Sequence, residues 1–190
     1  SYGKGASVLR MVEAYLGEAA FRQGVHEYLR EFAFGNSRGS DLWRHLAEAS
    51  QQPVDRILDT WTGVPGYPIL VARRSGTTVR IAQQPFRYLG TPPPQLWPVP
   101  LTYRIGTTEG RRLMEGAETT LEAPPGVPVL LNAGRHGFYR VEYDAEGYEA
   151  LGRAWPDLAP VDRWGLLDDL YALLQAGRVD FAQYRRWVER

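Results

Sequence analysis

Three histidines are the side chains best suited to hold a metal ion or to move a proton near neutral pH: His26, His45 and His136. None lies four residues from another, and the sequence contains no HExxH motif, no EF-hand loop and no cysteine. The helical spacing places His26 and His45 on polar, solvated helix faces, and the segment GRHGF places His136 in a tight turn between strands. We therefore expect no metal site within this chain.

Groups that could act as nucleophiles or cradle a phosphate are also incomplete. No GxSxG motif surrounds any serine, and GKG at residues 3–5 lacks the spacing and the preceding strand of a phosphate-binding loop. Asp168 and Asp169 are neighbours in a predicted helix, so their carboxylates should point in different directions and belong to a solvated face. The residues alone thus predict a chain without a complete active site.

Composition and charge narrow the function classes. The 190 residues carry 22 basic and 22 acidic side chains, which argues against nucleic acid as a partner. No apolar run approaches the ~20 residues that cross a membrane. The absence of cysteine excludes disulfides and favours a cytoplasmic location. The excess of arginine over lysine suggests, on codon usage alone, a bacterial genome rich in G and C.

The apolar residues of the first third recur with helical spacing. The pattern predicts four short helices between residues 4 and 61. Ser40 is a suitable N-cap for the third helix, and Pro53 suits the first turn of the fourth. The segment GVPGYP at 63–68 then ends the helical region, because its glycines and prolines prevent a helix from continuing.

The spacing changes to a period of two between residues 63 and 143. Alternating apolar residues predict short strands at 69–71, 79–81, 99–105 and 139–143. Six to eight such strands, separated by turns rich in Gly and Pro, are typical of an antiparallel β-sandwich. We expect this sandwich to be the middle of three regions.

Helical spacing returns between residues 144 and 190. The pattern predicts one helix that ends before Pro156, a second that starts at Pro160 and has Gly177 just after its end, and a third that Asp180 caps. Two antiparallel helices at the end of the chain could begin a helical array. The predicted fold class is therefore α+β in several parts: helices, then an antiparallel β-sandwich, then the first helices of a solenoid-like region.

Motifs along the whole chain carry a resemblance to a known family. The first third contains YGKGA, AYLGEAAFRQGV, FGNSRGSDLW and DTWTGVPGYP, and the rest contains WPVPLTY, VLLNAGRHGFYRVEYD and DRWGLLDDLYALLQAG. With these motifs in this order, the chain closely resembles the zinc metallopeptidases of the aminopeptidase N and puromycin-sensitive aminopeptidase family. The resemblance implies that residues 1–62 are the last helices of a thermolysin-like catalytic domain, that 63–143 are an entire β-sandwich, and that 144–190 begin a C-terminal helical domain.

The same resemblance implies a chemical role for Tyr2, which belongs to the family's YxKGA motif. The hydroxyl of that tyrosine donates a hydrogen bond to the oxygen of the tetrahedral intermediate. A phenol with a pKa of ~10 stays protonated at neutral pH, so it can donate without carrying charge. Gly3 and Gly5 have no Cβ, so they would let the backbone approach closely and turn into the helix, which would fix the position of the phenol. Lys4 could support the site electrostatically, although the residue pattern alone favours a solvated cation at a helix start.

The resemblance also implies a cofactor and partners. The intact enzyme would use zinc, held by an HExxH motif upstream of Ser1, and would remove N-terminal residues from peptides. As part of that longer enzyme, this chain should bind no metal by itself and should be inactive alone. Apolar faces of the two helical regions, left exposed where the chain is separated from the longer enzyme, would favour self-association. The alternative is a non-catalytic module that binds peptides or a partner protein, which the missing metal ligands favour for the chain as it stands.

Overall fold

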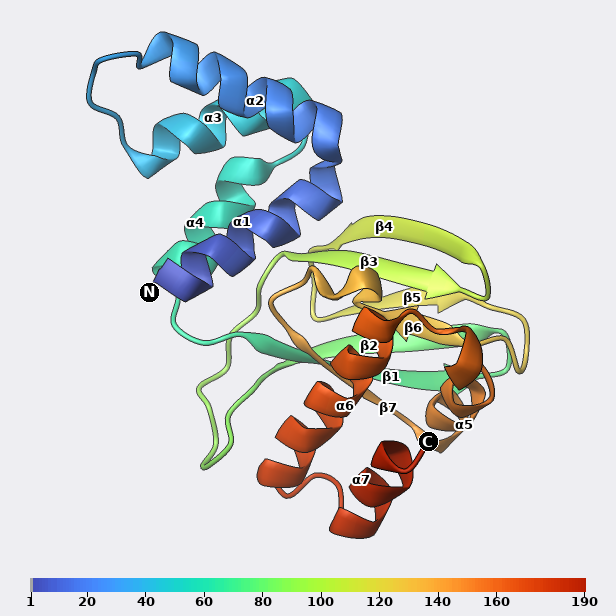
Figure 1. Ribbon diagram of the computed structural model, residues 1–190. Coiled ribbons are helices and arrows are strands. Elements are labelled where there is room, and N and C mark those ends of the chain that lie inside the picture. The colour runs from blue at the N-terminus through green and yellow to red at the C-terminus, as the bar shows by residue number, and fades with distance from the viewer. Residues whose placement is uncertain (1) are drawn as a thin grey trace.

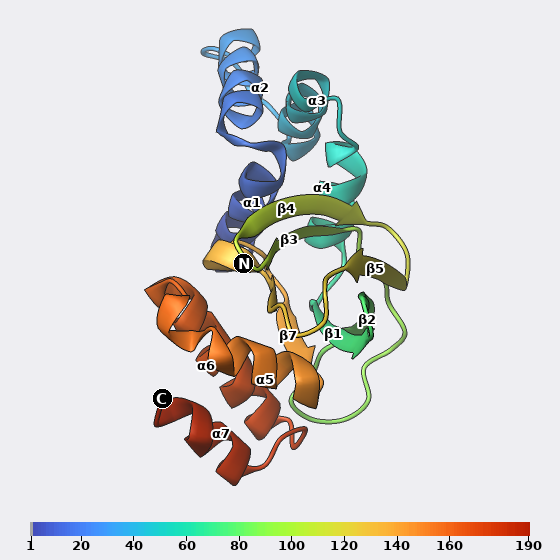
Figure 2. The same ribbon diagram turned by 90° about the vertical axis from the view of Figure 1, so that its right-hand side faces the viewer.

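The computed structural model describes residues 2–190 and shows two helical groups on either side of a β-sandwich (Figure 1). The first group comprises α1 (Tyr2–Leu16), α2 (Glu18–Glu31), α3 (Gly39–Ser50) and α4 (Val54–Gly63). α1 and α4 lie next to the sandwich, and α2 and α3 extend from it as a pair (Figure 2). These two helices approach closely at Gly24, where a Cβ atom would come within 2.9 Å of the Leu46 Cα.

Two sheets form the sandwich. The first has the strand order β5-β2-β1-β7, and the second has the order β4-β3-β6. The strands are β1 (Pro68–Ser75), β2 (Thr78–Pro85), β3 (Val99–Ile105), β4 (Thr108–Met114), β5 (Glu118–Glu122), β6 (Val129–Leu131) and β7 (Arg140–Tyr143). Among the described residues every pairing is antiparallel except that of β1 with β7, in which Leu70 lies opposite Val141. The sheets and their flanking helices confirm the predicted fold class, with one parallel pair added.

The second helical group follows the sandwich. It comprises α5 (Ala145–Arg153), α6 (Pro160–Gln175) and α7 (Phe181–Val188), with the short 3₁₀ helices η1 (Ala133–Arg135) between β6 and β7 and η2 (Trp155–Asp157) between α5 and α6. Asp180 caps α7 as predicted, because its carboxylate accepts a backbone N–H at 2.7 Å.

Two helices of the first group start differently from the prediction. α3 begins at Gly39, earlier than a cap at Ser40 would place it, because the Arg38 N–H donates to the Asp41 carboxylate at 2.7 Å. Pro53 lies just before α4 rather than in its first turn.

Strand β1 departs from strict alternation because both of its faces are covered. Its first five residues, 68–72, are all buried. Leu70 belongs to the main core, whereas Ile69 packs against Leu173 of α6 on the other face of the sheet. A strand covered on both faces has a continuous apolar run instead of an alternating one.

One continuous apolar core joins the three regions. Its members come from both helical groups and both sheets, and they include Val12, Trp61, Leu101, Val141 and Leu170. Trp61 also donates its indole N–H to the Pro98 carbonyl at 2.7 Å, which docks α4 onto the sandwich. The helices are therefore held in a fixed position relative to the sheets by burial of apolar surface.

Candidate functional site

Tyr2 is the first residue of α1, and its side chain is 97% exposed. The start of α1 lies next to the label N in Figure 1. The Tyr2 hydroxyl makes no hydrogen bond with the rest of residues 2–190. Within the described chain the phenol is a free hydrogen-bond donor at a helix start.

Lys4 anchors that helix start. Its ammonium group donates to the Val64 carbonyl at 2.8 Å and to the Gly66 carbonyl at 3.3 Å, both in the connection between α4 and β1. Partial burial lowers the pKa of Lys4. The lysine is therefore a structural tie and not the solvated cation that the pattern favoured. No atom of residues 2–190 lies within 4 Å of a Cβ built on Gly3 or Gly5, so the close approach that these glycines would allow stays a prediction for the intact enzyme.

Two adjoining cavities lie along α1. The first, which we call the α1–α6 cavity, has a volume of about 350 Å³ and lies between Ser7 and Arg10 of α1 and Trp164 of α6. The second, which we call the α1–β4 cavity, has a volume of about 620 Å³ and lies between α1 and the β3–β4 hairpin. Arg10 lines both, so the two cavities meet at this side chain.

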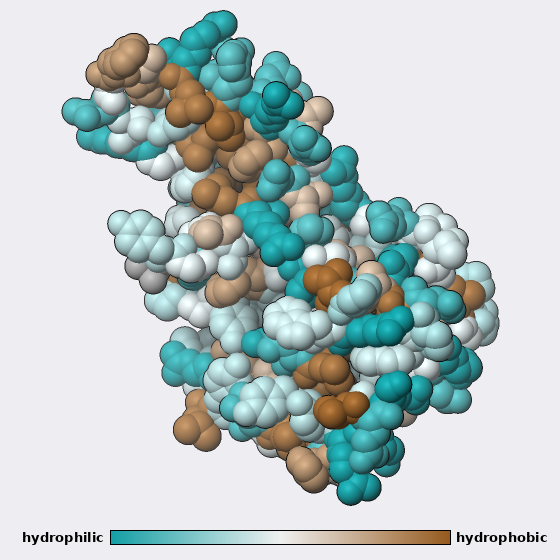
Figure 3. Space-filling model, viewed as in Figure 1, coloured by the Kyte–Doolittle hydropathy of each residue, from teal (hydrophilic) through white to brown (hydrophobic). Residues whose placement is uncertain are grey.

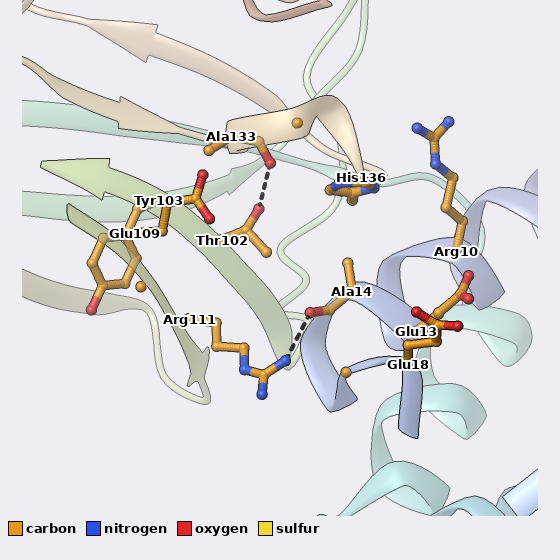
Figure 4. A pocket seen from close by; sticks show the side chains of 13 residues that line it. Arg10, Glu13, Ala14, Glu18, Thr102, Tyr103, Glu109, Arg111, Ala133 and His136 are labelled. Carbon is orange, nitrogen blue, oxygen red and sulfur yellow. Dashed lines mark hydrogen bonds between the residues drawn. The ribbon is translucent and has the colours of Figure 1, made fainter. Parts of the chain in front are cut away.

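Charged side chains line the α1–β4 cavity (Figure 4). Glu13 of α1, Glu18 of α2 and Glu109 of β4 form no ion pair with other described residues. Arg111 of β4 donates to a backbone carbonyl of α1 at 3.4 Å. The guanidinium of Arg10 points away from Glu13 and Glu18. This cavity thus contains three carboxylates and two guanidiniums, those of Arg10 and Arg111.

The three histidines lie apart from one another. His136 follows η1 in the β6–β7 connection, and its pKa is lowered by partial burial and by the nearby Arg10. His26 is exposed, as predicted. His45 is 5% exposed, which contradicts the predicted solvated face; its ring contacts a backbone carbonyl at 2.7 Å and the Glu31 carboxylate at 2.9 Å. The prediction failed because α2 covers a face of α3 that looks polar in isolation.

Two features are missing from the part of the chain that the structure describes. No group of three His, Cys, Asp or Glu side chains there is arranged to hold a metal ion. The zinc implied by the resemblance therefore has no fitting set of ligands among residues 2–190. In the same range, no helix combines the length and the apolar character needed to cross a membrane.

Two arginines and two aspartates form a largely buried ionic cluster beside the α1–α6 cavity. Arg135 donates to Asp168 and Asp169, in each case at 2.7 Å. Arg140 contacts both carboxylates as well. Asp169 also accepts the Val141 N–H at 3.2 Å. Burial raises the pKa of Asp169, and its contacts with the two guanidiniums oppose that rise.

This cluster contradicts the solvated face predicted for Asp168 and Asp169. Asp169 is 4% exposed and shares the buried stripe of α6 with Leu166 and Leu173. Asp162 lies on the same stripe and pairs with an arginine of β3 at 3.1 Å. Two acids seven residues apart within an apolar helical stripe are a sequence signal for buried ion pairs, because that spacing places both on one face.

Two family descriptions match parts of the chain. "Peptidase family M1 domain" matches residues 1–61, and "ERAP1-like C-terminal domain" matches residues 128–189. The chain is 42% identical over 184 residues to the Tricorn protease-interacting factor F2 of Thermoplasma acidophilum. It is 36% identical over 191 residues to the leucyl aminopeptidase of Saccharolobus solfataricus and 38% identical over 202 residues to the puromycin-sensitive aminopeptidase of Caenorhabditis elegans. This chain belongs to the M1 peptidase family.

The alignments with these M1 relatives cover nearly all of this chain but only a small part of each relative. They cover 97%, 100% and 97% of this chain but 23%, 24% and 21% of the respective relatives. The chain thus spans about a quarter of the length of the curated relatives it matches. The M1 match ends within α4, and the second match begins just before β6, so it includes the last two strands of the sandwich. None of the three is bacterial, so a bacterial origin stays a prediction.

Proposed function

We propose that this chain is part of a zinc-dependent aminopeptidase that removes N-terminal residues from peptides, and that Tyr2 stabilises the transition state. The aminopeptidases among the M1 relatives support peptides as substrates. The zinc and the general base would be held by other segments. The observation that carries the role of Tyr2 is its position, a free phenol on the first residue of a helix that Lys4 ties to the α4–β1 connection.

Tyr2 would act as a neutral hydrogen-bond donor. The carbonyl oxygen of the scissile bond gains negative charge when water adds to the carbonyl carbon. The phenol would donate its O–H to that oxygen, and phenols are protonated at neutral pH, so no proton has to be transferred first. Because Lys4 holds the start of α1, the backbone that carries the phenol is already in place before substrate binds.

We further propose a division into domains. Residues 1–62 would complete a thermolysin-like catalytic domain, 63–143 would form the sandwich that links it to a helical domain, and 144–190 would begin that domain. The apolar core shared by both helical groups and both sheets supports a linking role for the sandwich. The absence of cysteine supports a cytoplasmic location.

The substitution Tyr2→Phe in the full-length protein tests the proposed function. We expect kcat on an aminoacyl anilide to fall about 100- to 1000-fold with little change in KM, because the lost hydrogen bond forms only in the transition state. Tyr171→Phe is the matched control, because Tyr171 is also an exposed tyrosine on a helix. Normal turnover by Tyr2→Phe would rule out the donor role. Hydrolysis by the pure 190-residue chain with added zinc would contradict the placement of the metal site in other segments.

A further inference from the structure

Arg10 is a cation without an acidic partner in the described chain. The other two arginines that line the α1–α6 cavity, Arg135 and Arg140, are both paired with Asp168 and Asp169. Arg10 is exposed and forms neither an ion pair nor a hydrogen bond with other residues in 2–190. The paired cluster is neutral as a whole, so Arg10 leaves the cavity with one uncompensated positive charge.

The nearest acid on the same helix does not neutralise this charge. Glu13 follows Arg10 by three residues, a spacing that permits an ion pair on a helix. The structure has no such pair, and Figure 4 shows the Arg10 guanidinium directed away from Glu13. Glu13 lines only the α1–β4 cavity, whereas Arg10 lines both. The α1–α6 cavity is therefore suited to an anionic group.

The position of Arg10 relative to Tyr2 indicates what kind of anion would bind there. Eight residues of helix separate them, which corresponds to about 12 Å along the axis and a rotation of about 80°, so both lie on one side of α1. An extended peptide advances about 3.3 Å per residue. A peptide whose cleaved bond lies at Tyr2 would therefore bring its third or fourth residue after that bond to Arg10.

We propose that the α1–α6 cavity binds a carboxylate of the peptide substrate, three to four residues beyond the cleaved bond, and that Arg10 is the group that pairs with it. The inference rests on the proposed function, because Tyr2 marks the position of the cleaved bond. Trp164 is 59% exposed and lines the same cavity, where it offers an apolar face to the peptide beside the charged group. The carboxylate could be the C-terminus of a pentapeptide or an Asp or Glu side chain of a longer peptide.

Calorimetric binding to the full-length protein tests the proposal without relying on turnover. The probes are pentapeptides in which the first peptide bond is reduced to CH₂–NH, so they are not hydrolysed. One pair differs only in a free or an amidated C-terminus. A second pair is amidated and carries Glu or Gln at the fourth position. We expect the carboxylate-bearing member of at least one pair to bind about tenfold or more tightly, as for a hydrogen bond to a charged group.

Variants of Arg10 identify the group that is responsible. Arg10→Gln should reduce the preference for the carboxylate to about onefold, and Arg10→Lys should retain part of it because the charge remains. Arg22→Gln is the matched control, since Arg22 is an exposed arginine on α2 that lines neither cavity. Equal binding of both members in both pairs, or a preference that survives in Arg10→Gln, overturns the proposal. Hydrolysis of the unmodified amidated peptide, measured in parallel, reports on the proposed function separately.

Discussion

Replacing Asp169 by Asn tests how the buried ionic cluster holds α6 on the sandwich. The Asp169 carboxylate accepts two hydrogen bonds from Arg135, one from Arg140 and one from the Val141 N–H, and its side chain is 5% exposed. The side chains of the two arginines are 13% and 18% exposed. Asparagine keeps the shape but removes the charge, which leaves two guanidiniums facing the single carboxylate of Asp168. Removing one partner of a buried ion pair costs about 3–5 kcal/mol, and we expect this loss in the free energy of unfolding.

The assay is urea unfolding of the 190-residue chain followed by circular dichroism, with the midpoint shifting and the slope unchanged. Asp168→Asn is the matched control, because Asp168 contacts the same two arginines but is 30% exposed. We expect Asp168→Asn to lower the free energy of unfolding by about 1–2 kcal/mol, since water replaces part of the lost interaction. A loss for Asp168→Asn that equals or exceeds the loss for Asp169→Asn would refute the argument that burial decides the energy.

Two further predictions concern alkaline stability and association. Burial raises the pKa of Tyr139 to about 12, so above pH ~10 the unfolded state loses this proton first and the free energy of unfolding falls by about 1.4 kcal/mol per pH unit up to pH ~12. Tyr139→Phe should reduce the slope of stability measured between pH 10 and 11, and an unchanged slope would contradict the assignment. Figure 3 shows hydrophobic residues at the surface of the first helical group. Large apolar side chains are exposed there at Leu29 and Phe34, and on the second helical group at Trp164 and Phe181. We expect the isolated chain to self-associate through them, whereas light scattering that shows a monomer at high concentration would contradict this.

The local elements of the fold were predictable because local physics sets them. The change from helical spacing to a period of two and back located all three regions. Gly177 adopts the positive φ of +67° expected just after a helix end, and Asp180 caps the next helix. Neither prediction required knowledge of what these residues contact. The parallel pairing of β1 with β7 was not predictable in this way, because it joins segments about 70 residues apart.

The surroundings of the candidate site were harder to predict from the sequence. Lys4 looks like a solvated cation until the α4–β1 connection, 60 residues away, supplies its acceptors. His45 and Asp169 look polar and exposed until a neighbouring helix or strand covers them. Arg10 is the opposite case, because only the full set of contacts among residues 2–190 reveals that it has no partner there. Each of these properties depends on which distant parts of the chain come together, and residue spacing does not encode that.

The β6–β7 connection links the stability of the fold to the candidate binding site. Gly134 and Arg135 have positive φ angles of +73° and +56°, so the backbone turns sharply there. On one side of this turn the Phe138 N–H contacts the Met11 sulfur of α1 at 3.4 Å, and on the other side Arg135 binds Asp169 of α6. A shift of α6 relative to α1 must therefore displace this turn or break the ionic cluster. Because α1, this connection and α6 all line the α1–α6 cavity, the cluster that stabilises the fold also holds these parts of the cavity at a fixed distance.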